Sequence, residues 1–354
     1  MSKNRRGNFF EDFEVGQSFR HGVPRTVTDG DRALYIGLTG SRSALNTAST
    51  TATMLGMQGA PIEDVLVFNL VFGGTVPDIS LNAVANLGYA DGRFLAPVFS
   101  GDTLSVNSVV LAKKENSNGA NGVIYVRSTA RNQHGCEVLS YVRWVMVHKR
   151  KASEPTGTPA AIPRFPTFVE PARLLPPVFL EPQRITAVTG VEDLWESYRK
   201  GERIDHPSSM TINDSDHSIA TRLYQNNAKA HFDGQLMARS PLGKRLVYGG
   251  HVISICRSLA YDGLENCLGM LAINGGRHVS PVFADDTISC ATTIVDTYPL
   301  DGQIGALRLR TVGAKNIEST AEIEFPEGEV ERPTYSRNVV LDLDYTVTVP
   351  RGHH

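Results

Sequence analysis

The sequence predicts an α+β protein that consists of two copies of one domain, each a long helix packed on a strongly bent antiparallel sheet. Three observations lead to this prediction. Blocks of sequence occur twice in the same order, each half continues from them into long strands of alternating residues, and a proline-rich segment separates the halves. The 354 residues suffice for two domains of ordinary size.

Four pairs of sequence blocks occupy corresponding places in the two halves. They are FEVGQSFRH (from residue 13) and YRKGERIDH (198), VFGGTVPDIS (71) and VYGGHVISIC (247), GRFLAPVFSGDTLSV (92) and GRHVSPVFADDTISC (276), and VLSYVRWVMV (138) and VLDLDYTVTV (340). One shared block could be chance, whereas four in the same order indicate a duplication.

The elements of each half follow from its local pattern. A short strand leads through a turn into a helix after Thr26 or Thr211, because acidic residues follow each threonine as they follow an N-cap. A more apolar helix comes next, then the double glycine, then three or four strands such as 122–130 and 304–312. Two such copies can share one continuous sheet, which would make the chain a pseudo-dimer.

The segment between the halves is rich in proline, which excludes a helix or a central strand. Its prolines are Pro155, Pro159, Pro163, Pro166, Pro171, Pro176, Pro177 and Pro182. We therefore expect a first domain over residues 1–150, an extended linker over 151–185 and a second domain over 186–354.

Composition excludes several classes of protein. The chain is 41% hydrophobic and 20% charged with a net charge of −2, which gives no indication of a nucleic-acid or membrane partner. It has no apolar run of roughly 18 residues and no secretory signal. The cysteines, Cys136, Cys256, Cys267 and Cys290, form no CxxC pair, so we expect a reducing cytoplasm and no metal site.

The two halves differ in their polar residues. His231 in the second copy corresponds to Asn46 in the first, and His251 corresponds to Thr75. After a duplication one copy commonly keeps the site while the other helps to build the pocket. We therefore expect the reacting group in the second half.

Several of these motifs resemble a known family. TVTDGDRALYIGLTG, the double-glycine block and PVFSGDTL are similar to the MaoC-like hydratases of the hotdog fold, over essentially the whole chain. LVFNLVFGGTVPDISLNAVANLGYADGRF and RLYQNNAKAHF resemble, more closely, the mesaconyl-CoA hydratase (β-methylmalyl-CoA dehydratase) family. The resemblance implies a double hotdog and a hydro-lyase that adds water reversibly to a short branched enoyl-CoA with a free carboxylate, within carbon assimilation. Such a reaction needs no cofactor, because CoA is part of the acyl-CoA substrate.

The family signature pairs an aspartate with a histidine five residues later. The first copy has Ser41 and Asn46 at these positions, and the second has Asn226 and His231. A spacing of five places two residues about 140° apart on an ideal helix. The pair can therefore cooperate only if its first member lies on the turn before the helix, and asparagine cannot accept a proton at neutral pH.

Two interpretations of the catalytic group follow. In the first, His231 alone is the general base and acid, and the amide of Asn226 orients water. In the second, another carboxylate takes the aspartate's place, and the candidates are Asp233, Asp216 and Asp78. We favour the first, because a catalytic carboxylate would repel the free carboxylate of the substrate.

The remaining site candidates follow from the resemblance and from general chemistry. The family assigns an oxyanion-binding N–H to the position of Gly250, and Gly249 beside it would allow close approach of the backbone. A substrate carboxylate favours an arginine fork, for which the candidates are Arg277, Arg222 and Arg42. His251 could contact substrate or only bond a loop.

Two other functions fit the same sequence. A hotdog thioesterase would use water to attack the thioester carbonyl instead of the double bond. With asparagine in place of the aspartate, the chain could also be a protein that binds a CoA thioester without turnover. In each case we expect a homodimer, because hotdog folds commonly pair again.

Overall fold

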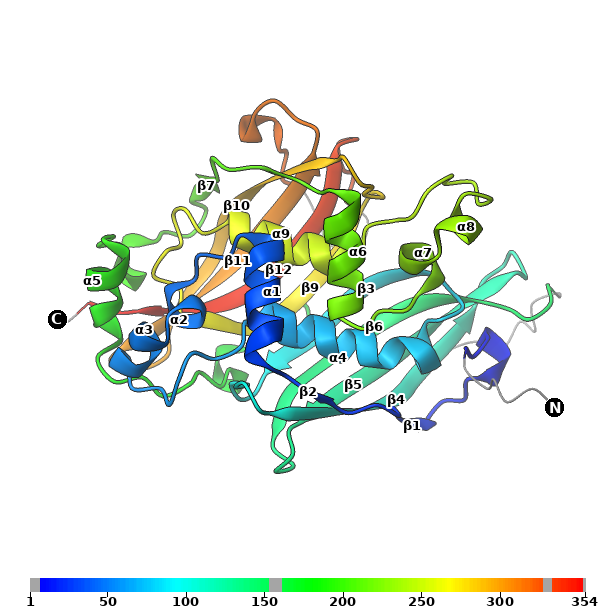
Figure 1. Cartoon of the computed structure of the whole chain (residues 1–354), viewed down its shortest axis with the longest axis horizontal. Helices are drawn as coiled ribbons and strands as arrows, with labels where there is room; N and C mark the ends of the chain where they lie inside the picture. The colour runs from blue at the N-terminus through cyan, green and yellow to red at the C-terminus, as the bar shows by residue number, and fades with distance from the viewer. Residues whose placement is uncertain (1–6, 153–160, 327–332, 353–354) are drawn as a thin grey trace.

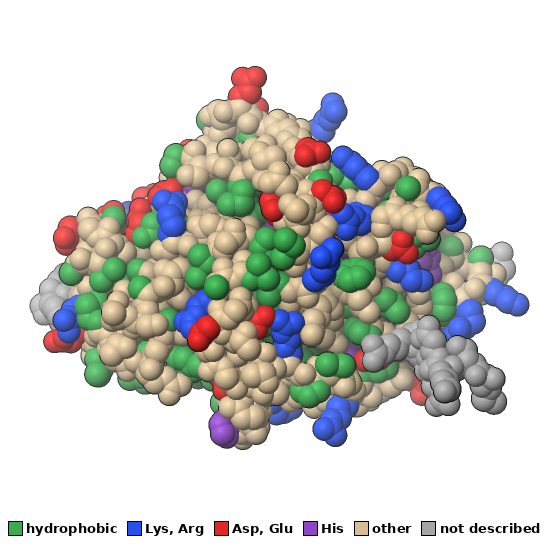
Figure 2. Space-filling model, viewed as in Figure 1, with side chains coloured by type: hydrophobic (Ala, Val, Ile, Leu, Met, Phe, Trp, Pro, Cys, Tyr) green, Lys and Arg blue, Asp and Glu red, His purple; other side chains and the backbone are tan. Residues whose placement is uncertain are grey.

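The protein is represented by a computed structural model that describes residues 7–152, 161–326 and 333–352. Residues 153–160, within the predicted linker, lie outside the described part. Two halves of similar architecture lie side by side, and their long strands form one sheet behind the helices (Figure 1). Charged side chains of both signs are scattered over the face shown in Figure 2.

Twelve strands form one antiparallel sheet in the described residues. They are β1 (Ser18–Arg20), β2 (Arg25–Thr26), β3 (Ala83–Phe94), β4 (Thr103–Glu115), β5 (Asn121–Arg131), β6 (Glu137–His148), β7 (Arg203–Asp205), β8 (Met210–Thr211), β9 (Gly269–His278), β10 (Thr287–Pro299), β11 (Ile304–Lys315) and β12 (Val339–Pro350). Their order is β1-β4-β5-β6-β3-β9-β12-β11-β10-β7, with β2 beside β4 and β8 beside β10.

The two halves join where β3 pairs with β9. Tyr89 lies opposite Gly276, and Gly92 lies opposite Ile273, in an antiparallel register. The sheet therefore continues from one half into the other. This is the pseudo-dimer that the duplication predicts, and the α+β double hotdog is confirmed.

The helices lie over this sheet (Figure 1). They are α1 (Asp29–Thr39), α2 (Ala44–Thr47), α3 (Ser49–Met54), α4 (Asp64–Ile79), α5 (Thr186–Thr189), α6 (Asp214–Leu223), α7 (Lys229–Phe232), α8 (Gly234–Met237) and α9 (Gly249–Leu259). The central helices of the two halves, α4 and α9, contact each other, and so do α1 and α6. One apolar core includes residues from both halves. No helix in the described ranges has the length and apolar character that crossing a membrane requires.

The caps of α1 and α6 differ from the prediction by two residues. Thr28 and Asn213 are the N-caps, each in a capping box with an aspartate three residues later. Thr26 and Thr211 instead belong to the short strands β2 and β8, where they pair with β4 and β10. The threonine followed by acidic residues correctly predicted that a helix starts nearby. Thr26 and Thr211 are not its N-caps, because they pair within the sheet.

The prediction that the double glycines follow the apolar helices was wrong. Gly73 and Gly74 lie inside α4, and Gly249 and Gly250 form the first turn of α9. Gly73 allows close packing between the halves, because a Cβ there would lie 1.7 Å from the carbonyl oxygen of Tyr224. The glycines therefore bring together chain segments that shape the site.

Candidate active site

A cavity with a volume of about 700 Å³ is lined by both halves. The first half contributes parts of α4, β3 and β6, and the second contributes the segment around α7 and α8, the start of α9 and the end of β9. Its ionisable wall residues other than tyrosine are all basic in the described ranges: Arg143, His148, Lys229, His231, Arg239 and His278. This cavity suits an anionic ligand of moderate size.

His231 lies on the short helix α7 and faces this cavity half-buried. Its Nδ1 lies 3.0 Å from the carbonyl oxygen of Leu246, so Nδ1 carries the hydrogen and donates it. Burial lowers the pKa of His231 to about 4, which leaves the ring neutral at pH 7. The unprotonated Nε2 is then available to accept a proton.

Asn226 precedes α7 in the turn that follows α6. Gln225 adopts a left-handed φ of 54°, which separates α6 from α7. The side chain of Asn226 is buried, its Oδ1 accepts from the N–H of Ala228 at 3.1 Å, and it lines the cavity. Its Nδ2 has no partner among the described residues. Asn226 thus lies on the turn before the helix, as cooperation with His231 requires.

Gly249, Gly250 and His251 form the start of α9, whose first N–H groups have no acceptor inside the helix. Gly249 lines the cavity, whereas Gly250 lies behind it, where a Cβ would be 2.0 Å from Oδ1 of Asn69. His251 is buried away from the cavity, with Nδ1 3.2 Å from the hydroxyl of Tyr224. The geometry therefore indicates that His251 packs in the core and contacts Tyr224, and that it does not line the cavity.

The three arginines proposed from the sequence do not line this cavity. Arg42 forms an ion pair with Asp262 at 2.7 Å near a different pocket, and Arg222 is exposed on α6. Arg277 is on β9 next to His278, but adjacent strand residues point to opposite faces, and only His278 reaches the cavity.

None of the three alternative carboxylates lines the cavity. Asp233 accepts from the N–H of Leu236 as the cap of α8 at 2.9 Å, and Asp216 accepts from Nδ2 of Asn213 at 2.7 Å. Asp78 accepts from Nδ1 of His21 at 2.8 Å. The geometry thus favours the interpretation in which His231 acts without a carboxylate. No cluster of metal-binding side chains occurs in the part of the chain that the structure covers.

His278 and Arg143 are among the cavity residues that were not predicted from the sequence. Nε2 of His278 lies 3.0 Å from the hydroxyl of Tyr89, and its ring occupies the space that a side chain at Gly249 would fill. Burial, with a smaller effect of His231, lowers the pKa of His278 to about 4. The duplication carried a signal for both, because the first copy has Phe94 where the second has His278, and the second has Tyr345 where the first has Arg143.

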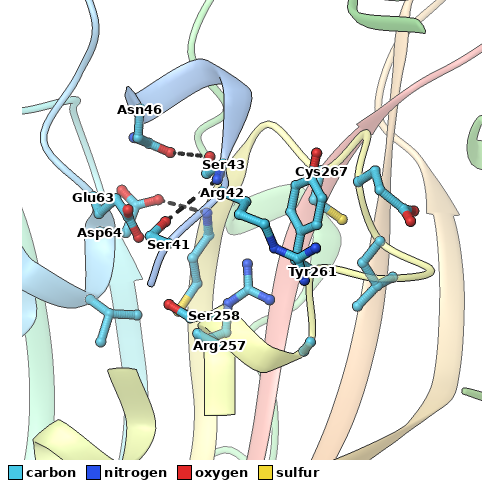
Figure 3. Close-up of a pocket in the computed structure, with 16 residues that line it drawn as sticks. Ser41, Arg42, Ser43, Asn46, Glu63, Asp64, Arg257, Ser258, Tyr261 and Cys267 are labelled. Atoms are coloured by element: carbon cyan, nitrogen blue, oxygen red, sulfur yellow. Dashed lines mark hydrogen bonds between the residues drawn. The ribbon is translucent and has the colours of Figure 1, made fainter. Parts of the chain in front are cut away.

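A second pocket corresponds to the first under the internal repeat (Figure 3). It is lined by Ser41 and Asn46, the counterparts of Asn226 and His231. Asn46 is held by internal hydrogen bonds, since Nδ2 donates to the Pro61 carbonyl at 3.1 Å and Oδ1 accepts from Ser43 at 2.6 Å. The volume is only about 50 Å³, which is too small for an acyl-CoA.

Comparison with known proteins agrees with this geometry. The family model of mesaconyl-CoA hydratase matches residues 1–321. The chain belongs to the mesaconyl-CoA hydratase family. It is 47% identical over 353 residues to a β-methylmalyl-CoA dehydratase of Chloroflexus aurantiacus, covering 99% of each chain. It is 46% identical to a mesaconyl-CoA hydratase of Cereibacter sphaeroides, covering 99% of this chain and 100% of that protein.

Solved structures place this family member among the double hotdogs. A MaoC domain dehydratase from Chloroflexus aurantiacus superposes with a TM-score of 0.92 at 46% identity, over 99% of this chain and 100% of that one. A Mycobacterium tuberculosis protein described as a double hotdog superposes with a TM-score of 0.75 at 22% identity, over 97% and 98% of the two chains. The second likeness supports the fold alone.

Proposed function

We propose that this protein is a hydro-lyase that catalyses the reversible hydration of mesaconyl-CoA to β-methylmalyl-CoA. The observation that carries the proposal is that the neutral His231 and the Asn226 amide line the same cavity of about 700 Å³. Relatives at 47% and 46% identity that bear these names support the choice of substrate.

The chemistry follows from the free nitrogen of His231. Nε2 accepts a proton from water while the water oxygen bonds to one carbon of the double bond, and the imidazolium then returns a proton to the other carbon. One water is added, the π bond is lost, and His231 regains its starting state. Asn226 donates from Nδ2 to the oxygen of that water, which fixes its direction of attack.

The N-terminus of α9 supplies the complementary charge. The thioester oxygen gains negative charge as water adds to the conjugated double bond. The N–H groups of Gly249 and Gly250 lie in the first turn of this 11-residue helix and have no acceptor inside it. Gly249 is on the cavity wall and Gly250 lies behind it, so we propose that the N–H of Gly249 donates to the thioester oxygen.

We also propose that the reaction requires no metal or organic cofactor, since a conjugated thioester is already activated for addition of water. Dialysis against a chelator should leave the rate of hydration unchanged. A large loss of rate that added metal restores would contradict this proposal.

Assembly and location are further proposals. We propose a homodimer of this pseudo-dimeric chain, which sedimentation velocity would distinguish from a single chain. We propose a cytoplasmic location, which the four free cysteines support, Cys136 being exposed.

Product analysis tests the function directly. Incubation with mesaconyl-CoA should yield a thioester heavier by one water, with no free thiol. Released CoA thiol would instead establish the thioesterase alternative. Binding with neither product would leave a protein that holds CoA thioesters without turnover.

A further inference from the structure

Arg143 has an unusual environment for a cation. It lies within β6 and is the largest of the fully buried side chains in the described residues. Nη2 donates to Oγ1 of Thr75 at 2.8 Å, both Nη atoms lie 3.4 Å from Oγ of Ser80, and the guanidinium lies 4.1 Å from the centre of the Phe72 ring. Two hydroxyls and a ring face are thus its neighbours.

Arg143 lacks an anionic partner among the described residues. No aspartate or glutamate of these ranges forms an ion pair with it, and its Nε has no acceptor there. Arginine keeps its charge in proteins, and a buried charge is costly unless a counter-charge and hydrogen bonds compensate it. Burial lowers the pKa of Arg143, as expected for a cation held away from water. An anion in the adjacent cavity would supply the missing counter-charge.

The cavity supplies the place for that anion. Arg143 belongs to the wall that also carries His231, and so does Tyr248, whose buried hydroxyl has no partner among the described residues. The Tyr248 ring is 5.5 Å from the rings of both His231 and Phe72. The guanidinium, Phe72, Tyr248 and His231 therefore form a continuous series of contacts along one wall.

The internal repeat indicates that the fold itself does not need this cation. Tyr345 occupies the corresponding position in β12, where its hydroxyl lies 3.0 Å from Oγ1 of Thr311. That half forms the same type of sheet with a tyrosine, whose hydroxyl also lies 3.4 Å from Nη1 of Arg257, a half-buried arginine on the wall of the pocket of about 50 Å³. A wholly buried arginine at this strand position is thus found only in the half whose strand lines the large cavity.

Other basic residues of the cavity serve a different part of an acyl-CoA. Lys229 and Arg239 are exposed, as suits the phosphates of CoA, which every CoA thioester carries. Arg143 is buried and suits a charge at the acyl end, which only dicarboxylic acyl groups carry. We propose that Arg143 binds the free carboxylate of the acyl group and selects dicarboxylic over uncharged enoyl-CoA thioesters. This inference rests on the proposed function.

The first test compares Arg143→Gln and Arg143→Lys with the unaltered protein on mesaconyl-CoA and crotonyl-CoA. The ratio of kcat/KM for mesaconyl-CoA to that for crotonyl-CoA should fall about 100-fold in Arg143→Gln and less in Arg143→Lys, since loss of a buried charge partner is costly. The matched control, Lys229→Gln, should lower both values alike and keep the ratio. An unchanged ratio in a folded Arg143→Gln would overturn the proposal.

A binding measurement keeps the proposal testable if Arg143→Gln does not fold. The unaltered protein should bind succinyl-CoA at least about tenfold more tightly than butyryl-CoA, and Arg143→Lys should reduce this preference. Equal affinities in the unaltered protein would overturn the role of Arg143. If the protein prefers succinyl-CoA yet does not hydrate mesaconyl-CoA, the proposed function fails while the carboxylate site stands.

Discussion

The state of His231 follows from two local contacts. The Leu246 carbonyl holds a hydrogen on Nδ1, and burial lowers the pKa so that Nε2 stays unprotonated at neutral pH. The same burial would make His231 a weak base in the free protein. A bound carboxylate nearby opposes this effect, because an opposite charge favours the imidazolium.

The pH dependence of hydration tests this state. His231 must be neutral to accept a proton, so kcat/KM, which reports the free enzyme, should fall as pH drops through about 4. With mesaconyl-CoA, the fall in kcat should lie at higher pH, because the substrate carboxylate raises the pKa of His231. Initial rates at each pH measure both, with circular dichroism to check folding. Coincident profiles for kcat and kcat/KM would contradict the role of the carboxylate.

Asn226→Asp tests whether the site has an asparagine because a carboxylate there would repel the substrate. The aspartate can still accept from the N–H of Ala228, so the turn should keep its shape. The new charge would repel the substrate carboxylate, and we expect the ratio of kcat/KM for mesaconyl-CoA to that for crotonyl-CoA to fall by about tenfold. Unchanged turnover of both substrates would disprove the electrostatic reason for asparagine.

The sequence was sufficient for some residues of the site and insufficient for others. His231 and Asn226 could be located because the repeat differs at those positions. Asp102 and Asp286 match across the halves and have the same structural contact, since they accept from the backbone N–H groups of Phe99 and Phe283 at 2.8 and 2.9 Å. Arg143 also differs from its counterpart Tyr345, but β6 is buried on both faces, so its alternation does not reveal which face meets the cavity.

At the scale of elements, the site depends on how closely α4 approaches the turn between α6 and α7. Gly73 provides that approach, since any side chain there would meet the Tyr224 carbonyl and then the backbone nitrogen of Asn226. Its counterpart in the second half, Gly249, leaves room for the ring of His278, because a Cβ there would lie 2.4 Å from Cε1 of that ring. Corresponding glycines of the two halves thus support one site.

Substitutions of the two neighbouring glycines of α4 should differ sharply. Gly73→Ala places a Cβ 1.7 Å from the Tyr224 carbonyl, so we expect a lower Tm and a loss of kcat of about tenfold or more as Asn226 moves. Gly74→Ala meets only Cγ2 of Val106 at 3.8 Å and should stabilise the helix by up to about 1 kcal/mol. Thermal unfolding and initial rates measure both. Equal effects of the two substitutions would contradict the packing argument.

The order and type of the elements could be predicted because hydrophobic periodicity and repetition both indicated them. Their ends could not. Thr26 and Thr211 look like caps locally, but pairing with β4 and β10 decides that they are strand residues. The glycines of α4 look like a turn, yet contacts between the halves, which local sequence does not contain, favour a helix there.

At the scale of the whole molecule, burial of several neutral histidines links stability to pH. Burial lowers the pKa of His231, His251 and His278 to about 4 each, below the ordinary value of 6.5. Between these values the unfolded chain binds more protons than the folded protein. The free energy of unfolding should therefore be fully retained above pH 6.5 and decline as pH falls toward 4, by on the order of 1 kcal/mol or more per histidine.

Urea unfolding at several pH values measures this decline. His251→Gln, which removes a buried histidine outside the cavity, should make the dependence on pH shallower. A free energy of unfolding that is constant from pH 6.5 to 4 would show that these histidines titrate alike in both states.

The two halves contain related pockets, and we propose that only the one with His231 is an active site. The most direct measurement is the initial rate of mesaconyl-CoA hydration by His231→Ala and by Asn46→Ala, its counterpart in the small pocket. We predict a loss of at least about 100-fold in kcat for His231→Ala and a change within about twofold for Asn46→Ala. A folded His231→Ala that retains the rate, or equal losses in both variants, would contradict the central claim.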